Sequence, residues 1–152
     1  MDINPYRFTA PWSDYEFATT MLNGCVGLVV LSMAWLTLLS PQELEFETDK
    51  PDMQTVAYWL ERFHPFIEAG KDAIVVFANR CGTEGNRVVT DEVDGGDQVC
   101  YAGSSCVMKF QNSGVRMFER NEGVAILGKG EEGVLVVDTA QHAKYSLTST
   151  RG

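Results

Sequence analysis

Apolar side chains recur at helical spacing in one long segment of the chain. Within residues 53–70 they stand three or four positions apart, which is typical of an amphipathic helix. Pro65 lacks the backbone donor that a helix interior needs, so it should kink the helix or end it early, and Gly70 should close it. The apolar face comprises Met53, Val56, Ala57, Leu60, Phe63, His64 and Ile67.

A shorter helix is predicted over residues 13–23. Ser13 stands three positions before Glu16, which is the spacing of a capping box. Asn23 and Gly24 follow, and both residue types commonly end helices. Residues 40–52 are polar and acidic with a proline near each end, which favours a loop.

Other segments carry the pattern of strands. Apolar and β-branched side chains run together in residues 26–35 and 73–79, as in strands buried on both faces. Residues 100–110 alternate like a strand interrupted at Gly103, and the turn sequence QNSG should pair them with residues 115–120.

The remaining segments are predicted to be connections and a hairpin. Residues 80–85, RCGTEG, favour a turn, and residues 89–99 favour an acidic loop or hairpin. A terminal hairpin is expected over residues 123–139, turning between Gly128 and Gly133. Residues 140–152 should form a tail that buries little.

No charged residue lies between Glu16 and Glu43, so this region raises the question of a membrane helix. A spanning helix needs about 20 mostly apolar residues, whereas this stretch is interrupted by Thr, Ser and Asn side chains. We therefore expect a buried strand here. A small membrane-anchored protein that spans the bilayer with residues 24–40 is the alternative.

The order of these elements favours an α/β fold of the layered α+β kind. Strand, helix and strand are followed by a run of short strands, which fits helices packed on one face of a sheet. The 152 residues are the size of one domain or part of one. We see no internal repeat and no linker that would mark a second domain.

Composition narrows the class of function. Apolar residues make up 45% and charged residues 22%, as in soluble globular proteins. Twelve Lys and Arg face 21 Asp and Glu, a formal net charge of −9. Nucleic acids are bound through clustered basic side chains, so we expect neither a nucleic-acid partner nor docking on an anionic membrane. The opening residues lack the apolar core of a secretory signal, and we expect an intracellular, cytoplasmic protein.

The cysteines Cys25, Cys81, Cys100 and Cys106 suggest reduced thiols. None forms the CxxC spacing of a structural zinc site. Along a strand, Cys100 and Cys106 would lie roughly 20 Å apart, too far for a disulfide. We expect neither a metal ion nor an organic cofactor.

Two residues could carry chemistry on their own. Cys81 follows Arg80 in the predicted turn, where a neighbouring cation would lower the thiol pKa and favour a nucleophile. No adjacent base is visible in the sequence. His64 lies on the apolar face of its helix, which favours a packed core histidine.

Residues 123–129 have the G-x-x-x-x-G-K outline of a phosphate loop. The outline encloses strand residues and lacks the Ser or Thr that follows in a phosphate loop, so we interpret it as a chance match.

Five strings in one order point to a family. They are MDINPYRF with the following APW and EFA, VVLSMAWL, AIVVFANRCGTEG, YAGSSCVM and GVLVVDT. Together they resemble the second half of a carbon–nitrogen hydrolase domain of the nitrilase superfamily, and within it the fungal protein N-terminal asparagine amidohydrolases. The resemblance covers residues 1–139 and implies the C-terminal half of an α-β-β-α sandwich, with residues 140–152 as a tail.

The resemblance implies a Glu–Lys–Cys mechanism for full-length relatives. Glu takes the thiol proton, the thiolate attacks the amide carbon, ammonia leaves, and water cleaves the thioester. Lys and the backbone N–H after the cysteine stabilise the oxyanion. The cysteine would stand one position before Met1, so Met1 corresponds to the oxyanion donor. Glu and Lys would belong to the missing half. We therefore expect no catalytic side chain in this chain and no family reaction from it alone.

The resemblance also implies which side chains border the pocket. Asp2 has an alternative interpretation as a buried turn acceptor, and Trp35 has one as core packing. Arg80 would hold either a carboxylate or a neighbouring acid, two options that the sequence does not separate. Gly103 and Ser105 match a hairpin that is structural. The pocket-lining set is Asp2, Trp35, Asn79 and Arg80.

Two hypotheses about function follow. The first is a truncated amidohydrolase whose full-length relatives act on protein or peptide N-termini, converting the side-chain amide of N-terminal Asn or Gln to the acid. The second is a non-catalytic remnant or interaction protein. Half of a layered sandwich leaves one sheet face uncovered, so residues 27–35 should show apolar surface and an open edge. Self-association, aggregation or dependence on a partner is expected.

Overall fold

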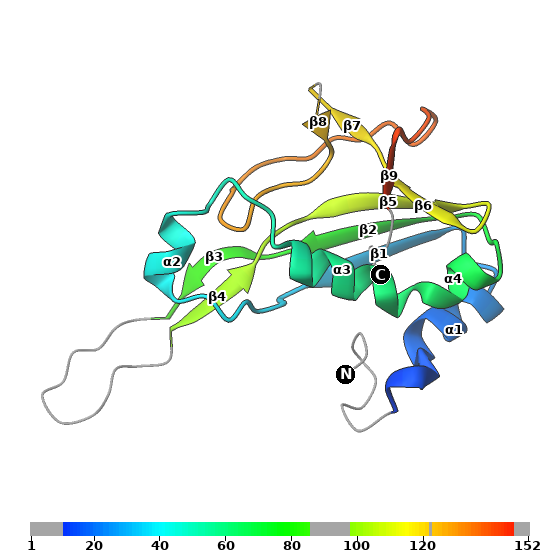
Figure 1. Ribbon diagram of the computed structural model, residues 1–152, viewed down its shortest axis with the longest axis horizontal. Coiled ribbons are helices and arrows are strands. Elements are labelled where there is room, and N and C mark those ends of the chain that lie inside the picture. The colour runs from blue at the N-terminus through cyan, green and yellow to red at the C-terminus, as the bar shows by residue number, and fades with distance from the viewer. Residues whose placement is uncertain (1–10, 86–97, 122, 148–152) are drawn as a thin grey trace, which may run out of the picture.

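A computed structural model describes residues 11–85, 98–121 and 123–147 of the chain (Figure 1). Helices lie on one side of a five-stranded sheet, and a long irregular segment after β8 lies on the other side. The elements are η1 (Trp12–Asp14), α1 (Glu16–Asn23), β1 (Leu28–Met33), α2 (Pro41–Glu45), α3 (Met53–Arg62), α4 (His64–Glu68), β2 (Ala73–Asn79), β3 (Cys81–Glu84), β4 (Val99–Ala102), β5 (Cys106–Gln111), β6 (Gly114–Met117), β7 (Glu119–Arg120), β8 (Gly123–Val124) and β9 (Tyr145–Leu147).

The sheet has the strand order β1-β2-β5-β6-β9. β1 and β2 are parallel, and each later pair is antiparallel. The register places Met33 beside Asn79 and Phe77 beside Cys106. The carboxyl ends of β1 and β2 and the amino end of β5 therefore meet at the same end of the sheet. β3 and β4 form a separate two-stranded sheet beyond that end.

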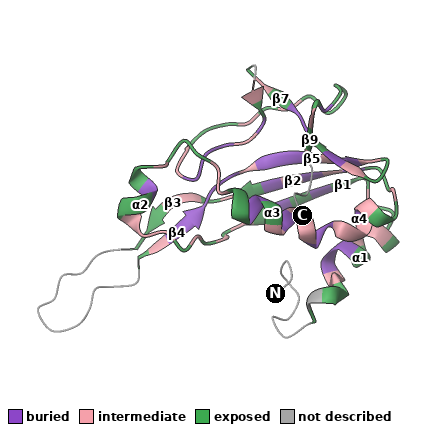
Figure 2. Cartoon of the chain, viewed as in Figure 1, coloured by how far each residue is buried: buried purple, intermediate pink, exposed green. Residues whose placement is uncertain are grey.

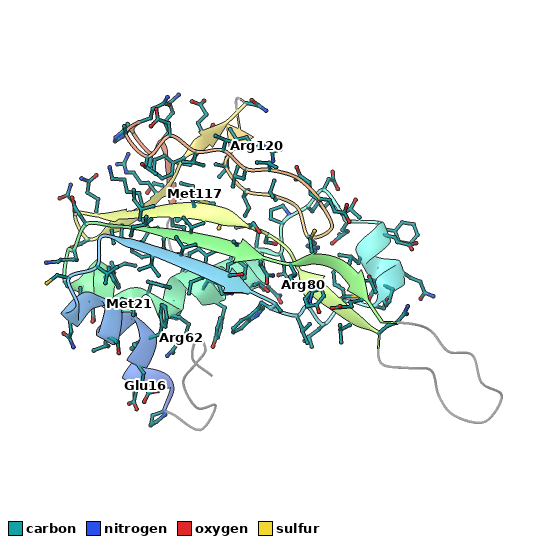
Figure 3. The ribbon with its side chains drawn as sticks, turned by 180° about the vertical axis from the view of Figure 1, so that it is seen from behind. Glu16, Met21, Arg62, Arg80, Met117 and Arg120 are labelled. Carbon is teal, nitrogen blue, oxygen red and sulfur yellow. The ribbon has the colours of Figure 1, made fainter. Side chains whose placement is uncertain are left out.

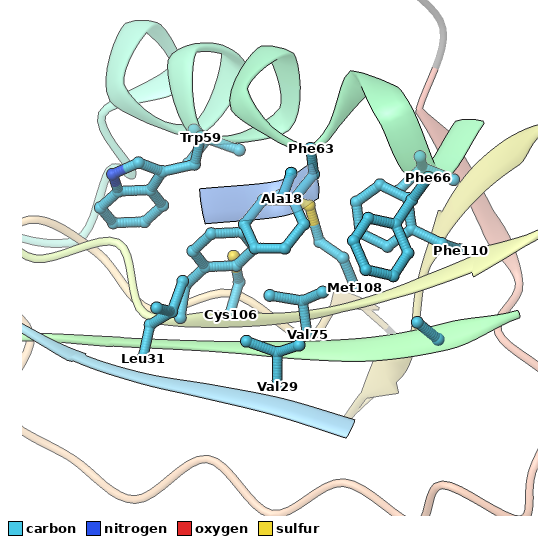
Figure 4. Close-up of a cluster of buried hydrophobic side chains, with 14 of the residues drawn as sticks. Ala18, Val29, Leu31, Trp59, Phe63, Phe66, Val75, Cys106, Met108 and Phe110 are labelled. Atoms are coloured by element: carbon cyan, nitrogen blue, oxygen red, sulfur yellow. The ribbon is translucent and has the colours of Figure 1, made fainter. Parts of the chain in front are cut away.

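The main core lies between this sheet and the helices α1, α3 and α4 (Figure 4). The inward side chains of β1 and β2 alternate with outward ones, as strand geometry requires. Trp59 of α3 stacks on Phe77 of β2, with ring centroids 5.1 Å apart and planes 3° from parallel. Phe63 meets Phe77 edge-on at 5.6 Å. The buried residues concentrate in the central strands and in the helix turns that face them (Figure 2).

A smaller cluster lies on the other face of the sheet. Val107 of β5 packs there with Phe118, Ala125 and Ala143. Partly buried side chains from β2 and from residues 131–138 pack against it: Ile74, Val76, Leu135 and Val137.

The layered α/β architecture predicted from the sequence is confirmed. The predicted helix over residues 53–70 is also found, and it breaks into α3 and α4 at Phe63, next to Pro65 in the first turn of α4. Gly70 ends the helical region with a φ of +59°. Asp52, which the sequence did not single out, caps α3 by accepting from the N–H groups of Gln54 and Thr55, both at 3.1 Å.

The capping box was predicted at the wrong helix. Ser13 lies inside η1 and does not cap α1, which begins at Glu16 after Tyr15 in the left-handed region. The box forms instead at α2, where Ser40 Oγ accepts from the Glu43 N–H and the Glu43 carboxylate accepts from the Ser40 N–H. Residues 40–52 thus contain a short helix where only a loop was expected. The same Ser-x-x-Glu spacing occurs at both places, so spacing alone did not separate them.

Two predicted connections are also corrected. The predicted turn at residues 80–85 contains strand β3, because Cys81–Glu84 pair with β4. The predicted hairpin over residues 123–139 is absent, since β8 pairs with β7 and residues 131–138 belong to no strand. Strand-like alternation favours an extended chain, but a hairpin also needs a partner in register.

The described part of the predicted tail, residues 140–147, joins the sheet, although most of its side chains are exposed. Tyr145–Leu147 form β9, which pairs with the free edge of β6. Ala143 is 1% exposed. The domain boundary at residue 139 remains a prediction.

The apolar run before Glu43 forms a strand. β1 lies within residues 24–40, so the membrane-helix alternative is wrong for this segment. In the described part of the chain, no helix combines the length and apolar character that crossing a membrane requires. β1 is also the edge of its sheet, and its outward side chains Leu28 and Val30 are 56% and 63% exposed. The predicted uncovered apolar surface is therefore present.

Candidate functional site

The structure brings together three of the residues that the sequence placed at a pocket. Asn79 is the last residue of β2, and Arg80 follows it. The Arg80 N–H donates to the Met33 carbonyl at 3.0 Å, which ties β2 to the end of β1. Trp35 lies two residues further along the same exit from β1. Their role in lining a pocket remains a prediction, and Met1 and Asp2 lie outside the described residues.

The side chain of Asn79 joins three backbone segments. Its Oδ1 accepts from the Trp35 N–H at 2.7 Å. Its Nδ2 donates to the carbonyls of Trp35 at 3.2 Å and Gly103 at 3.1 Å. Both amide protons are thus used within the fold. Asn79 therefore holds the exit of β1 and the β4–β5 turn against the end of β2, and we call residues 35, 79, 80, 103 and 105 the Asn79 junction.

Ser105 completes the junction from the start of β5. Its hydroxyl lies 3.0 Å from both the Asn79 nitrogen and the Asn79 carbonyl oxygen, accepting from one and donating to the other. Gly103 adopts a φ of +50° and donates its N–H to the Arg80 carbonyl at 3.0 Å. A Cβ on Gly103 would lie 2.2 Å from the Lys129 carbonyl oxygen, so this position accommodates only glycine without movement. Gly103 and Ser105 therefore shape the turn.

Trp35 contributes both its backbone and its ring. Its carbonyl also accepts from the Ala102 N–H at 2.9 Å. The half-buried indole lies 5.1 Å from the Tyr58 ring and packs against the main core. The core-packing interpretation of Trp35 thus describes its ring.

Arg80 holds a neighbouring acid. Its Nη2 lies 3.0 Å from Glu84 Oε2, and its guanidinium carbon stands 4.6 Å from the Tyr101 ring centroid. The Tyr101 hydroxyl donates to the same carboxylate oxygen. This hydrogen bond, and then Arg80, keep the pKa of Glu84 below its usual range, while the carboxylate raises the pKa of Tyr101. The Arg80 side chain is 55% exposed and lies where β2 leads into β3 (Figure 3).

Neither Cys81 nor Cys106 is an activated thiol. Burial, followed by the charges of Glu132 and Glu131, raises the pKa of Cys81, so the lowered pKa suggested by the sequence is wrong. Burial raises the pKa of Cys106 to about 12. All four cysteines are free, as expected. His64 is also corrected: it is partly exposed and lies 3.3 Å from the Glu68 carboxylate.

A second junction, which sequence reasoning missed, lies beside the first. The N–H groups of Lys129 and Gly130 donate to the carbonyls of Lys50 and Thr48, both at 3.0 Å. The Lys129 ammonium, 7% exposed as a residue, pairs with the Glu47 carboxylate. Gly128 allows this approach, because a Cβ there would lie 2.2 Å from the Thr48 oxygen. The G-K-G sequence was the available signal, since small residues mark close backbone contacts.

Among the described residues, neither junction contains a cluster of metal-binding side chains. Within residues 11–85, 98–121 and 123–147, no group of three or more His, Cys, Asp or Glu side chains is arranged to hold a metal ion.

Comparison with known proteins adds the relation that geometry alone does not provide. Over 120 residues the chain is 32% identical to the protein N-terminal amidase of Schizosaccharomyces pombe, covering 72% of this chain and 37% of that protein. Over 122 residues it is 25% identical to the protein N-terminal amidase of Saccharomyces cerevisiae, covering 44% of this chain and 27% of that protein. No family model matches the chain. No solved structure matches it significantly. The chain spans little more than a third of the first relative, and over that span it is homologous to fungal protein N-terminal amidase.

Proposed function

We propose that this chain forms the C-terminal part of a protein N-terminal amidase domain of the nitrilase superfamily. The observation that carries the proposal is the 32% identity to the Schizosaccharomyces pombe amidase. The architecture agrees with half of an α-β-β-α sandwich, because helices cover one face of the sheet while β1 exposes Leu28 and Val30 on the other. The complete domain would hydrolyse the side-chain amide of N-terminal Asn, with Gln as the related substrate, and would act in the cytoplasm without a metal ion or organic cofactor.

In this proposal the described residues build one wall of the pocket. The reacting groups, a Glu, a Lys and a Cys just before Met1, would come from the part of the relatives that this chain does not span. Met1 would supply the oxyanion N–H, and Asp2, Trp35 and Arg80 would border the substrate. Asn79 would act by fixing the position of Trp35, because all three of its side-chain hydrogen bonds end on backbone.

A chimera tests this proposal. The aligned segment of the Schizosaccharomyces pombe amidase is replaced by this chain, and ammonia release is measured from peptides that begin with Asn, Gln or Asp. We expect release from the Asn peptide and none from the Asp peptide, which has no side-chain amide. A folded chimera that releases no ammonia from either amide peptide would contradict the proposal.

A non-catalytic interaction protein is the second candidate, and the thiols favour it for the isolated chain. Cys106 is buried and the pKa of Cys81 is raised, so neither is prepared to attack an amide. We expect the isolated 152-residue chain to release no ammonia. Turnover by this chain that disappears in the Cys81→Ser variant would show that Cys81 had replaced the family nucleophile.

A further inference from the structure

Arg80 is the cationic residue of the Asn79 junction, and its charge is already engaged. Its Nη2 lies 3.0 Å from Glu84 Oε2, and the Tyr101 hydroxyl donates to the same oxygen. The guanidinium carbon also stands 4.6 Å from the Tyr101 ring centroid. Strand register explains this cluster, because Tyr101 of β4 pairs with Gly82, the residue midway between the two charged side chains. The three side chains therefore share one face of the β3–β4 sheet.

The Arg80–Glu84 pair remains accessible among the described residues. The two side chains are 55% and 52% exposed, whereas Tyr101 is 7% exposed as a residue. Gly82 places no side chain between them, and a Cβ at this position would meet nothing within 4 Å. A molecule that reaches this face of β3 would therefore meet a guanidinium and a carboxylate together, with no net charge between them.

The second junction pairs its cations in the same way. Lys129 and Lys50 both form ion pairs with Glu47, one at each carboxylate oxygen. The cations of the two junctions are Arg80, Lys50 and Lys129, and each has a glutamate partner. As far as the structure describes these junctions, neither offers an unpaired cation to a bound anion.

In the proposed reaction, substrate and product differ by one group. The substrate side chain ends in a neutral amide, whereas the side chain of the product, an N-terminal Asp or Glu, ends in a carboxylate. A guanidinium binds a carboxylate through two parallel hydrogen bonds. An unpaired Arg80 beside the pocket would therefore bind the product more tightly than the substrate and slow its release. Glu84 engages Arg80 instead, and its negative charge repels a second carboxylate.

We propose that Glu84 is a specificity-determining residue, which disfavours the acid product by engaging the Arg80 guanidinium. The inference rests on the proposed function, because Arg80 acts on the product only where it borders the pocket. Tyr101 supports this role, since its hydroxyl holds the Glu84 carboxylate and its ring lies against the guanidinium. The pocket wall formed by this chain thus favours ligands whose N-terminal side chain is neutral.

The chimeric amidase that carries this chain provides the test. Ammonia release from an Asn peptide is measured at rising concentrations of the matching Asp peptide, which gives KM and the inhibition constant of the product. Glu84→Gln keeps the size of the side chain and an acceptor for Tyr101 but removes the charge. It should lower the ratio of the inhibition constant to KM about 10-fold. Glu119→Gln is the matched control, because Glu119 pairs with Lys144 from β7, and it should leave the ratio unchanged.

A double variant tests whether the effect passes through Arg80. Arg80→Gln combined with Glu84→Gln removes the guanidinium, so the ratio should return towards that of the unmodified chimera. Added salt should reduce the effect of Glu84→Gln alone. Circular dichroism verifies folding, and Glu84→Thr is the second charge-removing variant if Glu84→Gln does not fold.

The outcomes separate this inference from the proposed function. An unchanged ratio in Glu84→Gln, an equal change in Glu119→Gln, or a change that persists in the double variant would overturn the inference and leave the proposed function intact. A folded, unmodified chimera that releases no ammonia from the Asn peptide would overturn the proposed function, and the role of Glu84 with it.

Discussion

Replacing Asn79 with Leu should destabilise the fold without emptying its core. Asn79 makes three side-chain hydrogen bonds, to the N–H and carbonyl of Trp35 and to the carbonyl of Gly103. Each such bond contributes about 1 kcal/mol net, so we expect a loss of about 3 kcal/mol in the free energy of unfolding. For a chain of this size that loss corresponds to a fall in melting temperature of roughly 6–12 °C.

Urea denaturation followed by Trp fluorescence measures this loss. Asn23→Ala, at the exposed end of α1, is the control and should change the free energy of unfolding by less than about 0.5 kcal/mol. Asn79→Asp separates a general packing role of this side chain from its hydrogen bonds, because it retains the acceptor for the Trp35 N–H but loses the donors to the Trp35 and Gly103 carbonyls. It should destabilise the chain about as much as Leu or more, since its charge faces two carbonyls. If both Asn79 variants matched the control, the junction would not hold these segments together.

Three further outcomes follow from the geometry. Gly103→Ala should cost about 2–5 kcal/mol in urea denaturation, because of its positive φ and the 2.2 Å approach to backbone, whereas Gly27→Ala meets nothing within 4 Å and should be tolerated. The hydrogen bond that Lys129 donates lowers the pKa of Glu47 in the folded chain. The stabilisation from this pair is therefore complete above the usual pKa of 4.5 and is lost as the pH falls through the lower folded pKa. Denaturation curves of the unmodified chain and Glu47→Gln should therefore converge below pH 4.5; a constant difference would contradict this. In the native chain a thiol reagent at neutral pH should modify exposed Cys25 well before Cys81, whose pKa is raised, and equal rates measured by mass spectrometry would contradict that assignment.

Sequence patterns were sufficient where a signal is local. The β-branched runs predicted β1 and β2, and Pro65 predicted the break between α3 and α4. Both depend on residues that are neighbours along the chain or on one helix face. The grouping of Trp35, Asn79 and Arg80 came instead from the family resemblance, and the three lie near one another because the parallel strands β1 and β2 end side by side.

Signals that depend on a distant partner were missed. β3 contains Gly82 at a φ of +78°, so its sequence resembles a turn. It becomes a strand only through its pairing with β4. β9 has only three residues, and its pairing depends on β6 having a free edge. The hydrogen bonds of Asn79 end on residues 44 and 24 positions away, which no local pattern reveals.

The contact between Lys129 and Glu47 also constrains the order in which the chain can assemble during synthesis. Its two residues are 82 positions apart, and α2 leads directly into the segment that it holds. A ribosome releases the chain from its N-terminus, so residues 47–50 emerge well before their partners at 128–130. Contacts this distant in sequence close late and slow folding. During that interval Glu47 has no counter-ion, and the carbonyls of Thr48 and Lys50 have not yet received their hydrogen bonds. The segment after α2 is therefore the part of the nascent chain that a protease or chaperone would encounter.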